Sequence, residues 1–375
     1  MGSEAAPLDE RRARHALARL IGGSPPDAFF GPATRSEHWQ RLVGQAVVER
    51  VVPDVALAHR SGIVALDAAE AHEVDELWAA RMSQCLRIEQ VAVWLVDELA
   101  HRGIDVRVLK GLATAHLDHP DPSARQFGDL DILVRPHDMR AVVDMLLGEG
   151  FVRRYQEFRP GFDERFVKSV SLAGPIEVDI HRTLAHGPVG YRIPVDELWS
   201  TNESLMVGGV ELKALHRPGR YVHACLHWYL TVPPVRLSTL SDIAIMVRRG
   251  GVSVDDVEET ASRWGVLHEV RAATASAVRE LSWPDDISTD WQREAEPHPL
   301  AAALLASHRD RTTPSSARSL LSVMTIPRLP AKLTFLFWLL VPWGRTLGDV
   351  GLDRTSRVRL RLVNRWRSPR KLLRR

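Results

Sequence analysis

Cysteine is nearly absent from this chain of 375 residues, which contains only Cys85 and Cys225. Both lie in segments with a helical pattern, so they form neither a disulfide framework nor a zinc site, and a reducing compartment suits them. Long apolar runs are also missing. The longest, residues 333–343, includes Thr334 and Pro342 and is too short to cross a bilayer. Because the N-terminus also lacks the apolar segment of a secretory signal, we expect a cytoplasmic protein without a transmembrane segment.

An excess of charge of one sign is lacking as well. The 49 Lys and Arg residues oppose 47 Asp and Glu residues, which gives a formal net charge of +2. Such a chain has no overall field that requires an obligate nucleic-acid partner. The exception is local, because residues 354–375 are crowded with arginine and lysine. A tail of this kind is either a solvated end or a surface for an anionic partner.

The patterns along the chain predict four regions. We expect an N-terminal helical region over residues 1–80, an α/β core over 81–200, a helical domain over 201–290 and a C-terminal helical extension with the basic tail over 291–375. Strands are predicted at 106–109, 129–134, 151–152, 165–173 and 176–182. Helices are predicted at 11–20, 36–60, 67–102, 112–117, 136–147, 218–230, 236–249, 253–264, 266–282, 298–310 and 331–346. Pro53 is expected to interrupt or kink the helix over 36–60, and the segment 67–102 is expected to form one or two helices. The helices before residue 103 show no recognisable chemistry and are expected to be scaffold or lid.

Two aspartates, Asp129 and Asp131, stand at the start of the apolar run 129–134. Successive side chains on a strand alternate between faces, so the two carboxylates share one face while Leu130 and Ile132 cover the other. Two such carboxylates repel each other unless a cation lies between them, and hard divalent ions prefer oxygen ligands. Taken alone, the pattern fits two solvated acids at a strand end equally well.

A third carboxylate favours the metal-binding interpretation. In the segment 176–182, apolar and polar residues alternate, so Asp179 and His181 share one face. Asp179 could join the pair at 129 and 131 to hold two divalent ions, which stabilise the attacking and leaving oxygens of a nucleotidyl transfer. Lys110-Gly111, after the first predicted strand, adds a cation and a backbone turn that can approach phosphates.

The order of these motifs resembles a known family. The segments are Leu-Lys-Gly at 109–111, Arg-x-x-Gly-Asp-Leu-Asp-Ile-Leu-Val at 125–134, a helix that ends before Gly150-Phe151, and Glu-Val-Asp-Ile-His at 177–181. They are similar to the nucleotidyltransferase fold of the DNA polymerase β superfamily, and in particular to the bacterial uncharacterised nucleotidyltransferases of the NTP_transf_5 type. The resemblance implies an α+β fold in which a polymerase β-like core, a small mixed sheet with helices, is flanked by N- and C-terminal helical regions. The helical domain over 201–290 would then lie on the acceptor side.

The resemblance also implies roles for individual residues. Asp129, Asp131 and Asp179 would be the catalytic residues and the ligands of Mg2+ or Mn2+, with a nucleoside triphosphate (NTP) as co-substrate. Asp179 would also be the base for the attacking hydroxyl. Lys110 and the Gly111 amide would contact phosphate.

Four further residues have more than one interpretation. Arg125 could stabilise charge on the phosphate, pair with one of the aspartates or be solvated. His181 could help to bind the nucleotide or only position a carboxylate. His223 and His227 have a spacing that can hold a metal on a helix, but no acidic partner with zinc-enzyme spacing follows. Packing or capping is therefore the favoured interpretation for these two histidines.

Three functions are compatible with these patterns. The first is a metal-dependent nucleotidyltransferase that moves a nucleoside monophosphate from an NTP to a hydroxyl or phosphate acceptor, and the resemblance connects such proteins with natural-product biosynthesis. The second is a glycosyltransferase that uses Asp-x-Asp to hold Mn2+, although this would require a nucleotide-binding βαβ region before the motif and gives no reason for Asp179. The third is a catalytically silent binding protein, such as an antitoxin-like partner.

Overall fold

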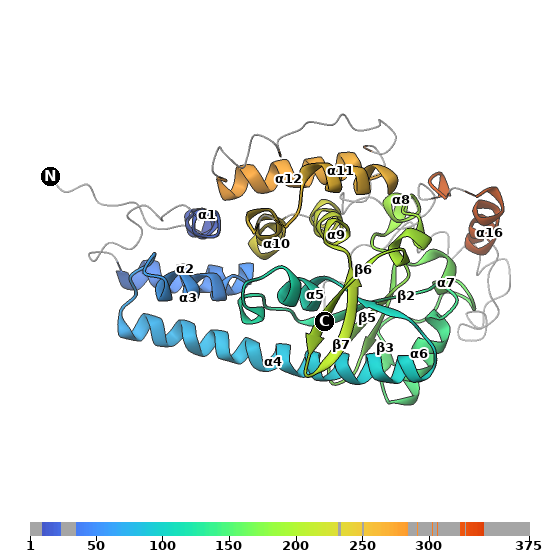
Figure 1. Cartoon of the computed structure of the whole chain (residues 1–375), viewed down its shortest axis with the longest axis horizontal. Helices are drawn as coiled ribbons and strands as arrows, with labels where there is room; N and C mark the ends of the chain where they lie inside the picture. Colours follow the sequence, from blue (N-terminus) through green and yellow to red (C-terminus); the bar gives the residue numbers. More distant parts are fainter. Residues whose placement is uncertain are drawn as a thin grey trace, which may run out of the picture.

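A seven-stranded mixed sheet lies at the centre of the molecule, with helices on both sides (Figure 1). This computed structural model describes residues 10–23, 35–231, 234–249, 251–283, 291, 302, 306, 323–326 and 328–340. The strands are β1 (Val106–Val108), β2 (Asp129–Val134), β3 (Val152–Arg153), β4 (Ser169–Ala173), β5 (Glu177–His181), β6 (Asn202–Val207) and β7 (Val210–Leu215), in the order β3-β4-β5-β2-β1-β7-β6. β2 pairs in parallel with β5 and β1 in parallel with β7, whereas the other neighbouring pairs are antiparallel.

One face of the sheet is covered by the long helix α4 (Ala68–His101) and by α6 (Met139–Gly148) (Figure 1). Asp67 begins α4 with a capping box, in which its side chain accepts backbone hydrogen bonds while Glu70 reaches back to the Asp67 N–H. Leu130 of β2 is fully buried in the core that this face shares with the helices. The alternation of β2 therefore directs its aspartates toward the opposite face.

A second hydrophobic core joins helices from both ends of the described chain. Its helices are α1 (Glu10–Ile21), α2 (Arg35–Glu49), α3 (Val52–Arg60), α9 (Arg217–Leu230), α10 (Leu237–Arg248), α11 (Val254–Arg263) and α12 (Leu267–Leu281). The buried carboxylate of Glu49 links three of them, because it accepts hydrogen bonds from Arg14 Nε of α1 at 3.0 Å and from the Leu237 N–H of α10 at 2.6 Å. The N-terminal helices thus form one layer with the helices that follow the sheet.

The predicted small mixed sheet with flanking helices is confirmed, and most predicted elements are present. The shorter elements are α5 (Lys110–Leu117), α7 (Asp163–Phe166), α8 (Gly187–Gly190), α16 (Leu329–Leu340) and the 3-10 turns η1 (Pro122–Ala124) and η2 (Val195–Trp199). Cys85 and Cys225 are both buried and free, as expected. Among the described helices, none combines the length and the apolar character needed to cross a bilayer. Most of the predicted helix 298–310 and the whole tail 354–375 lie outside the described residues.

The structure corrects three predicted elements. The segment 36–60, expected to be interrupted or kinked at Pro53, is indeed two helices, but they separate at Arg50, whose φ is +59°. Pro53 lies in the first turn of α3, where proline is tolerated. The first residues of the predicted strand 165–173 belong to the short helix α7. The hairpin β6–β7 was not predicted, although Gly208 and Gly209 both have positive φ, as a two-residue hairpin turn requires. This hairpin extends the sheet next to β1.

Candidate active site

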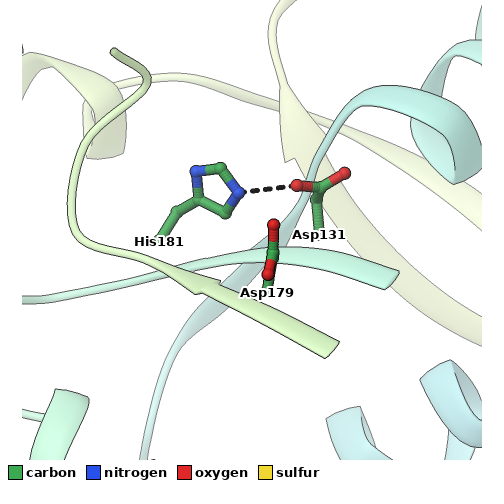
Figure 2. Close-up of side chains that lie close together, drawn as sticks. All are labelled: Asp131, Asp179 and His181. Carbon is green, nitrogen blue, oxygen red and sulfur yellow. Dashed lines mark hydrogen bonds and ion pairs between the residues drawn. The ribbon is translucent and has the colours of Figure 1, made fainter. Parts of the chain in front are cut away.

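The carboxylates predicted to act together meet on adjacent strands. In the parallel pair β2–β5, Asp131 is opposite Asp179, and Asp129 is opposite Glu177. Figure 2 shows Asp131, Asp179 and His181 with their side chains close together on one side of the two strands. Each of these three residues offers one possible ligand atom, and the three atoms lie within 4.8 Å of one another. The structure thus brings Asp179 beside Asp131, from which it is 48 positions away in sequence.

Asp129 is close to this group without being part of it. Its carboxylate falls outside the set of ligand atoms that lie within 4.8 Å, but it faces the same cavity as Asp131. Burial and the neighbouring charge of Asp131 raise the pKa of Asp129. A divalent cation would relieve this repulsion, since it stabilises both carboxylates in their ionised form.

Asp131 is held by two partners. Its Oδ1 atom accepts hydrogen bonds from Lys110 Nζ at 2.5 Å and from His181 Nε2 at 2.6 Å (Figure 2). Burial alone would raise the pKa of Asp131, but Lys110 and His181 hold it well below its usual range. Asp179 has a different environment, because its Oδ1 accepts a hydrogen bond from the Ser171 hydroxyl on β4. The two opposed carboxylates are therefore oriented by different elements.

His181 positions Asp131. The ring is fully buried, and burial together with the charges of Lys110 and Lys168 lowers the pKa of His181 to about 4. The neutral ring donates its Nε2–H to Asp131, so this nitrogen is not free to bind a metal while that hydrogen bond lasts. The sequence placed His181 on the Asp179 face, and the structure shows that its direct contact is with Asp131.

Lys110 and Gly111 begin α5 at the edge of the same cavity. Lys110 has a φ of +43°, an uncommon conformation for a residue with a side chain, and no side chain caps the first turn of the helix. Gly111 has a packing requirement of its own, because a Cβ atom there would lie 2.3 Å from Phe127 Cβ. Packing against Phe127 alone therefore requires glycine at position 111. This requirement is compatible with the predicted contact between the Gly111 amide and phosphate.

Arg125 is engaged by a residue that the sequence did not indicate. Its guanidinium forms a two-point ion pair with Asp242 of α10, at 2.5 Å from Nε to Oδ1 and 2.8 Å from Nη2 to Oδ2. It also donates to the carbonyl of Gln126. Burial would raise the pKa of Asp242, but Arg125 brings it down to about 2. Arg125 is therefore paired with Asp242 rather than with Asp129 or Asp131, and it lines the cavity, so its predicted contact with phosphate stays a prediction.

Two adjoining cavities meet at Asp129. The inner lobe, of about 200 Å³, contains Lys110, Asp131 and the α9 histidines His223 and His227. The outer lobe, of about 440 Å³, extends past Gln84, Gln126 and Glu177. Both lobes share the side chains of Arg50, Phe127, Asp129 and Arg236. Asp129 therefore lies where the two spaces meet, whereas Asp131 lines the inner lobe.

Sequence reasoning missed several residues of these cavities. His223 and His227 were noticed for their spacing, but only the fold directs them toward the aspartates. His223 is buried, and its Nε2 has no hydrogen-bond partner in the described part of the chain. Lys168, which precedes β4, does not line either cavity, but burial and the charge of the nearby Lys110 lower its pKa to about 8. Arg50 and Arg81 belong to helices that were expected to be only scaffold or lid.

Comparison with known proteins gives three findings. The family model described as "Uncharacterised nucleotidyltransferase" matches residues 35–281 of the chain. No curated protein matches. A solved structure, described as an antigenic nucleotidyltransferase-like protein from Paracoccidioides brasiliensis, is similar at 17% identity and a TM-score of 0.36, and the match covers 56% of this chain and 94% of that one.

Proposed function

The chain belongs to the uncharacterised nucleotidyltransferase family, and we propose that it is a metal-dependent enzyme that transfers a nucleoside monophosphate from an NTP to a hydroxyl or phosphate acceptor. The observation that carries this proposal is the pairing of Asp131 with Asp179 on adjacent parallel strands, beside Lys110. Carboxylate oxygens are the donors that Mg2+ and Mn2+ prefer, and two of the three potential ligand atoms within 4.8 Å of one another are carboxylate oxygens, from Asp131 and Asp179. The donor set therefore fits the metal that the family implies.

The proposed roles follow from these contacts. A divalent ion bound by Asp129, Asp131 and Asp179 would neutralise charge on the triphosphate and make the attacking hydroxyl more acidic. Asp179 accepts the proton of that hydroxyl, since its partner Ser171 occupies only one of its two oxygens. Lys110 and the first turn of α5 bind phosphate oxygens at the inner lobe. His181 keeps Asp131 in its orientation.

The two other functions have less support. In the described residues no strand precedes β1, so the βαβ region that a glycosyltransferase would place before its Asp-x-Asp motif has no counterpart there. A silent binding protein has no need for opposed carboxylates that are each held by their own partner.

A transfer assay distinguishes the three functions. The protein is incubated with Mg2+, a mixture of small-molecule and macromolecular cell extracts, and NTPs radiolabelled at either the α- or the γ-phosphate. We expect a product that carries the α-label but not the γ-label, and none with Asp179→Asn. Transfer from a sugar nucleotide would favour the glycosyltransferase, and the absence of any labelled product from every extract would favour the silent protein.

A further inference from the structure

The acceptor's chemistry is indicated by the outer lobe. We propose that the outer lobe binds a phosphoryl group of the acceptor substrate, an inference that rests on the proposed nucleotidyltransferase function. Three arginines from separate elements line this lobe: Arg50 between α2 and α3, Arg81 in α4 and Arg236 immediately before α10. All three are exposed, and none forms an ion pair with another residue in the described ranges. Guanidinium groups suit a phosphate, because each is always charged and can donate two parallel hydrogen bonds to its oxygens.

The acidic residues of the outer lobe do not cancel these charges. Glu177 is already paired, since both oxygens of its carboxylate contact the Arg154 guanidinium at 2.7 Å. Asp129 is the other acid of the lobe and belongs to the proposed metal site. Burial and the charge of Arg236 lower the pKa of Arg50, as expected for cations that crowd one another. An anion in this lobe would relieve that repulsion.

A buried structural bond places two of the arginines together. The Glu49 carboxylate accepts a hydrogen bond from the backbone N–H of Leu237 at 2.6 Å. Glu49 directly precedes Arg50 in the chain, and Leu237 directly follows Arg236. This bond fixes the end of α2 against the start of α10. Arg50 and Arg236 are therefore held on the same side of the cavity although 186 residues separate them.

The backbone of Arg50 indicates that its side chain matters. A residue with a side chain at φ +59° costs about 1 kcal/mol relative to glycine, which adopts this conformation freely. In the described chain, Arg50, Lys110 and Ser282 are the non-glycine residues with positive φ, and the first two line the cavity. Strain of this kind is concentrated at binding sites, where the side chain compensates for it.

An unpaired donor gives an independent indication. Gln126 is only 6% exposed and lines the outer lobe, yet its Nε2 has no hydrogen-bond partner among the described residues. Buried polar atoms are almost always hydrogen-bonded, so a missing partner points to a ligand. An oxyanion held by the arginines would supply the acceptor that this amide lacks.

The position of the lobe assigns the phosphoryl group to the acceptor rather than to the NTP. Lys110 and the start of α5 lie in the inner lobe, whereas Arg81 and Gln126 line only the outer one. In an in-line displacement, the attacking and leaving oxygens are on opposite sides of the reacting phosphorus. With the triphosphate at Lys110, the acceptor approaches from the other side of Asp129, where Arg81 lies beside the shared arginines Arg50 and Arg236.

Calorimetric titration of the full chain tests this assignment. Ribose 5-phosphate, and ribose as its uncharged control, are titrated into protein with Mg2+ and α,β-methylene-ATP, a non-reactive NTP analogue. We expect the phosphate-bearing sugar to bind and ribose not to bind. Arg81→Gln should weaken binding of the phosphate-bearing sugar by about tenfold or more and leave nucleotide affinity within about twofold. Arg87→Gln, an exposed arginine on the same helix but outside the cavity lining, is the matched control and should behave as wild type.

The other outcomes overturn the assignment in distinguishable ways. If Arg81→Gln weakens the nucleotide as strongly as the sugar phosphate, the outer lobe holds the triphosphate. If ribose 5-phosphate binds no better than ribose, or Arg81→Gln has no effect, the lobe is not a phosphoryl site. If wild-type protein does not bind the nucleotide analogue, the proposed nucleotidyltransferase function is wrong. If the sugar phosphate nevertheless binds and Arg81→Gln weakens that binding, the outer lobe is still a phosphate site.

Discussion

At the scale of single residues, Asp131 combines a structural and a proposed catalytic role. Sequence reasoning treats it as one acid of a repelling pair, in which a neutral substitute would relieve strain. In the fold, however, Asp131 accepts hydrogen bonds from both Lys110 and His181. Removal of its charge therefore leaves a lysine that is only 19% exposed without a counter-ion. We therefore expect the loss of this charge to destabilise the protein, whereas the repulsion seen in the sequence alone suggests that it would stabilise it.

We predict that Asp131→Asn and Asp179→Asn both abolish nucleotidyl transfer but differ in stability. Asp131→Asn should lower the free energy of unfolding by about 2 kcal/mol because of the unpaired Lys110. Asp179→Asn should lower it by less than about 1 kcal/mol, since one hydroxyl hydrogen bond is affected. Urea denaturation measures both values, with the exposed Asp144→Asn of α6 as control. Equal losses of unfolding free energy in the two variants would show that the ion pair between Lys110 and Asp131 does not stabilise the fold.

Gly111 allows a second test at this scale. Gly111→Ala would place a Cβ atom 2.3 Å from Phe127 Cβ, so the start of α5 or the Phe127 backbone must move. We expect a loss of about 2 kcal/mol in the free energy of unfolding, as is typical of an overpacked core. Gly148→Ala is the matched control, because a Cβ there meets no atom within 4 Å, and it should be neutral or stabilising. A Gly111→Ala variant as stable as the control would show that the close approach to Phe127 is easily relieved.

At the scale of elements, the ion pair between Arg125 and Asp242 connects the loop before β2 to α10. We predict that Asp242→Asn lowers the free energy of unfolding by about 3 kcal/mol, because it leaves the Arg125 guanidinium without a counter-ion. The folded pKa of Asp242, about 2, is below its ordinary value of 3.8. The stability that its charge contributes is therefore fully present above about pH 4 and is lost as the pH falls toward 2.

Denaturant titrations at several pH values check this prediction. The difference in unfolding free energy between wild type and Asp242→Asn should be constant from pH 5 to 7 and should shrink below about pH 4. A difference that grows as the pH falls would mean that Asp242 is not held in its ionised form by Arg125.

Elements with a local pattern could be predicted from the sequence, and those that depend on distant contacts could not. The alternation around Asp129–Val134 and Glu177–His181 identified the two central strands and the faces of their aspartates. The partner of Arg125 could not be found, because Asp242 is on a helix 117 residues away. Pro53 indicated a break in the helix over 36–60, but its position at Arg50 could not be predicted, since nothing in the sequence marks Arg50 as a left-handed residue. The β6–β7 hairpin was recoverable from Gly208-Gly209, whose signal was overlooked between two apolar runs.

At the scale of the whole molecule, the cavity is built from segments far apart in the chain. The sheet supplies the carboxylates, and the layer that joins helices from both ends of the described chain supplies arginines and histidines around them. The N-terminal helices, expected to be only scaffold or lid, thus contribute Arg50 to the cavity. This organisation explains why no single stretch of sequence contains the proposed site.

The basic tail, outside the described residues, permits a prediction at this scale. Deletion of residues 354–375 should leave NTP turnover within a few-fold of wild type, because the proposed binding groups all lie elsewhere. Turnover of both forms is compared over a range of ionic strength. A deficit of the shortened protein that widens as salt is lowered would instead show that the tail attracts the anionic substrate.

The most direct test of the central claim is the binding of Mn2+, followed by electron paramagnetic resonance, with and without α,β-methylene-ATP. This measurement does not depend on knowledge of the acceptor. The account predicts that wild-type protein binds Mn2+, that the nucleotide analogue strengthens this binding, and that Asp131→Asn and Asp179→Asn each weaken it by about tenfold or more, whereas Asp144→Asn does not. Nucleotide binding that persists unchanged in EDTA, or Mn2+ binding that is unaffected in both active-site variants, would contradict it.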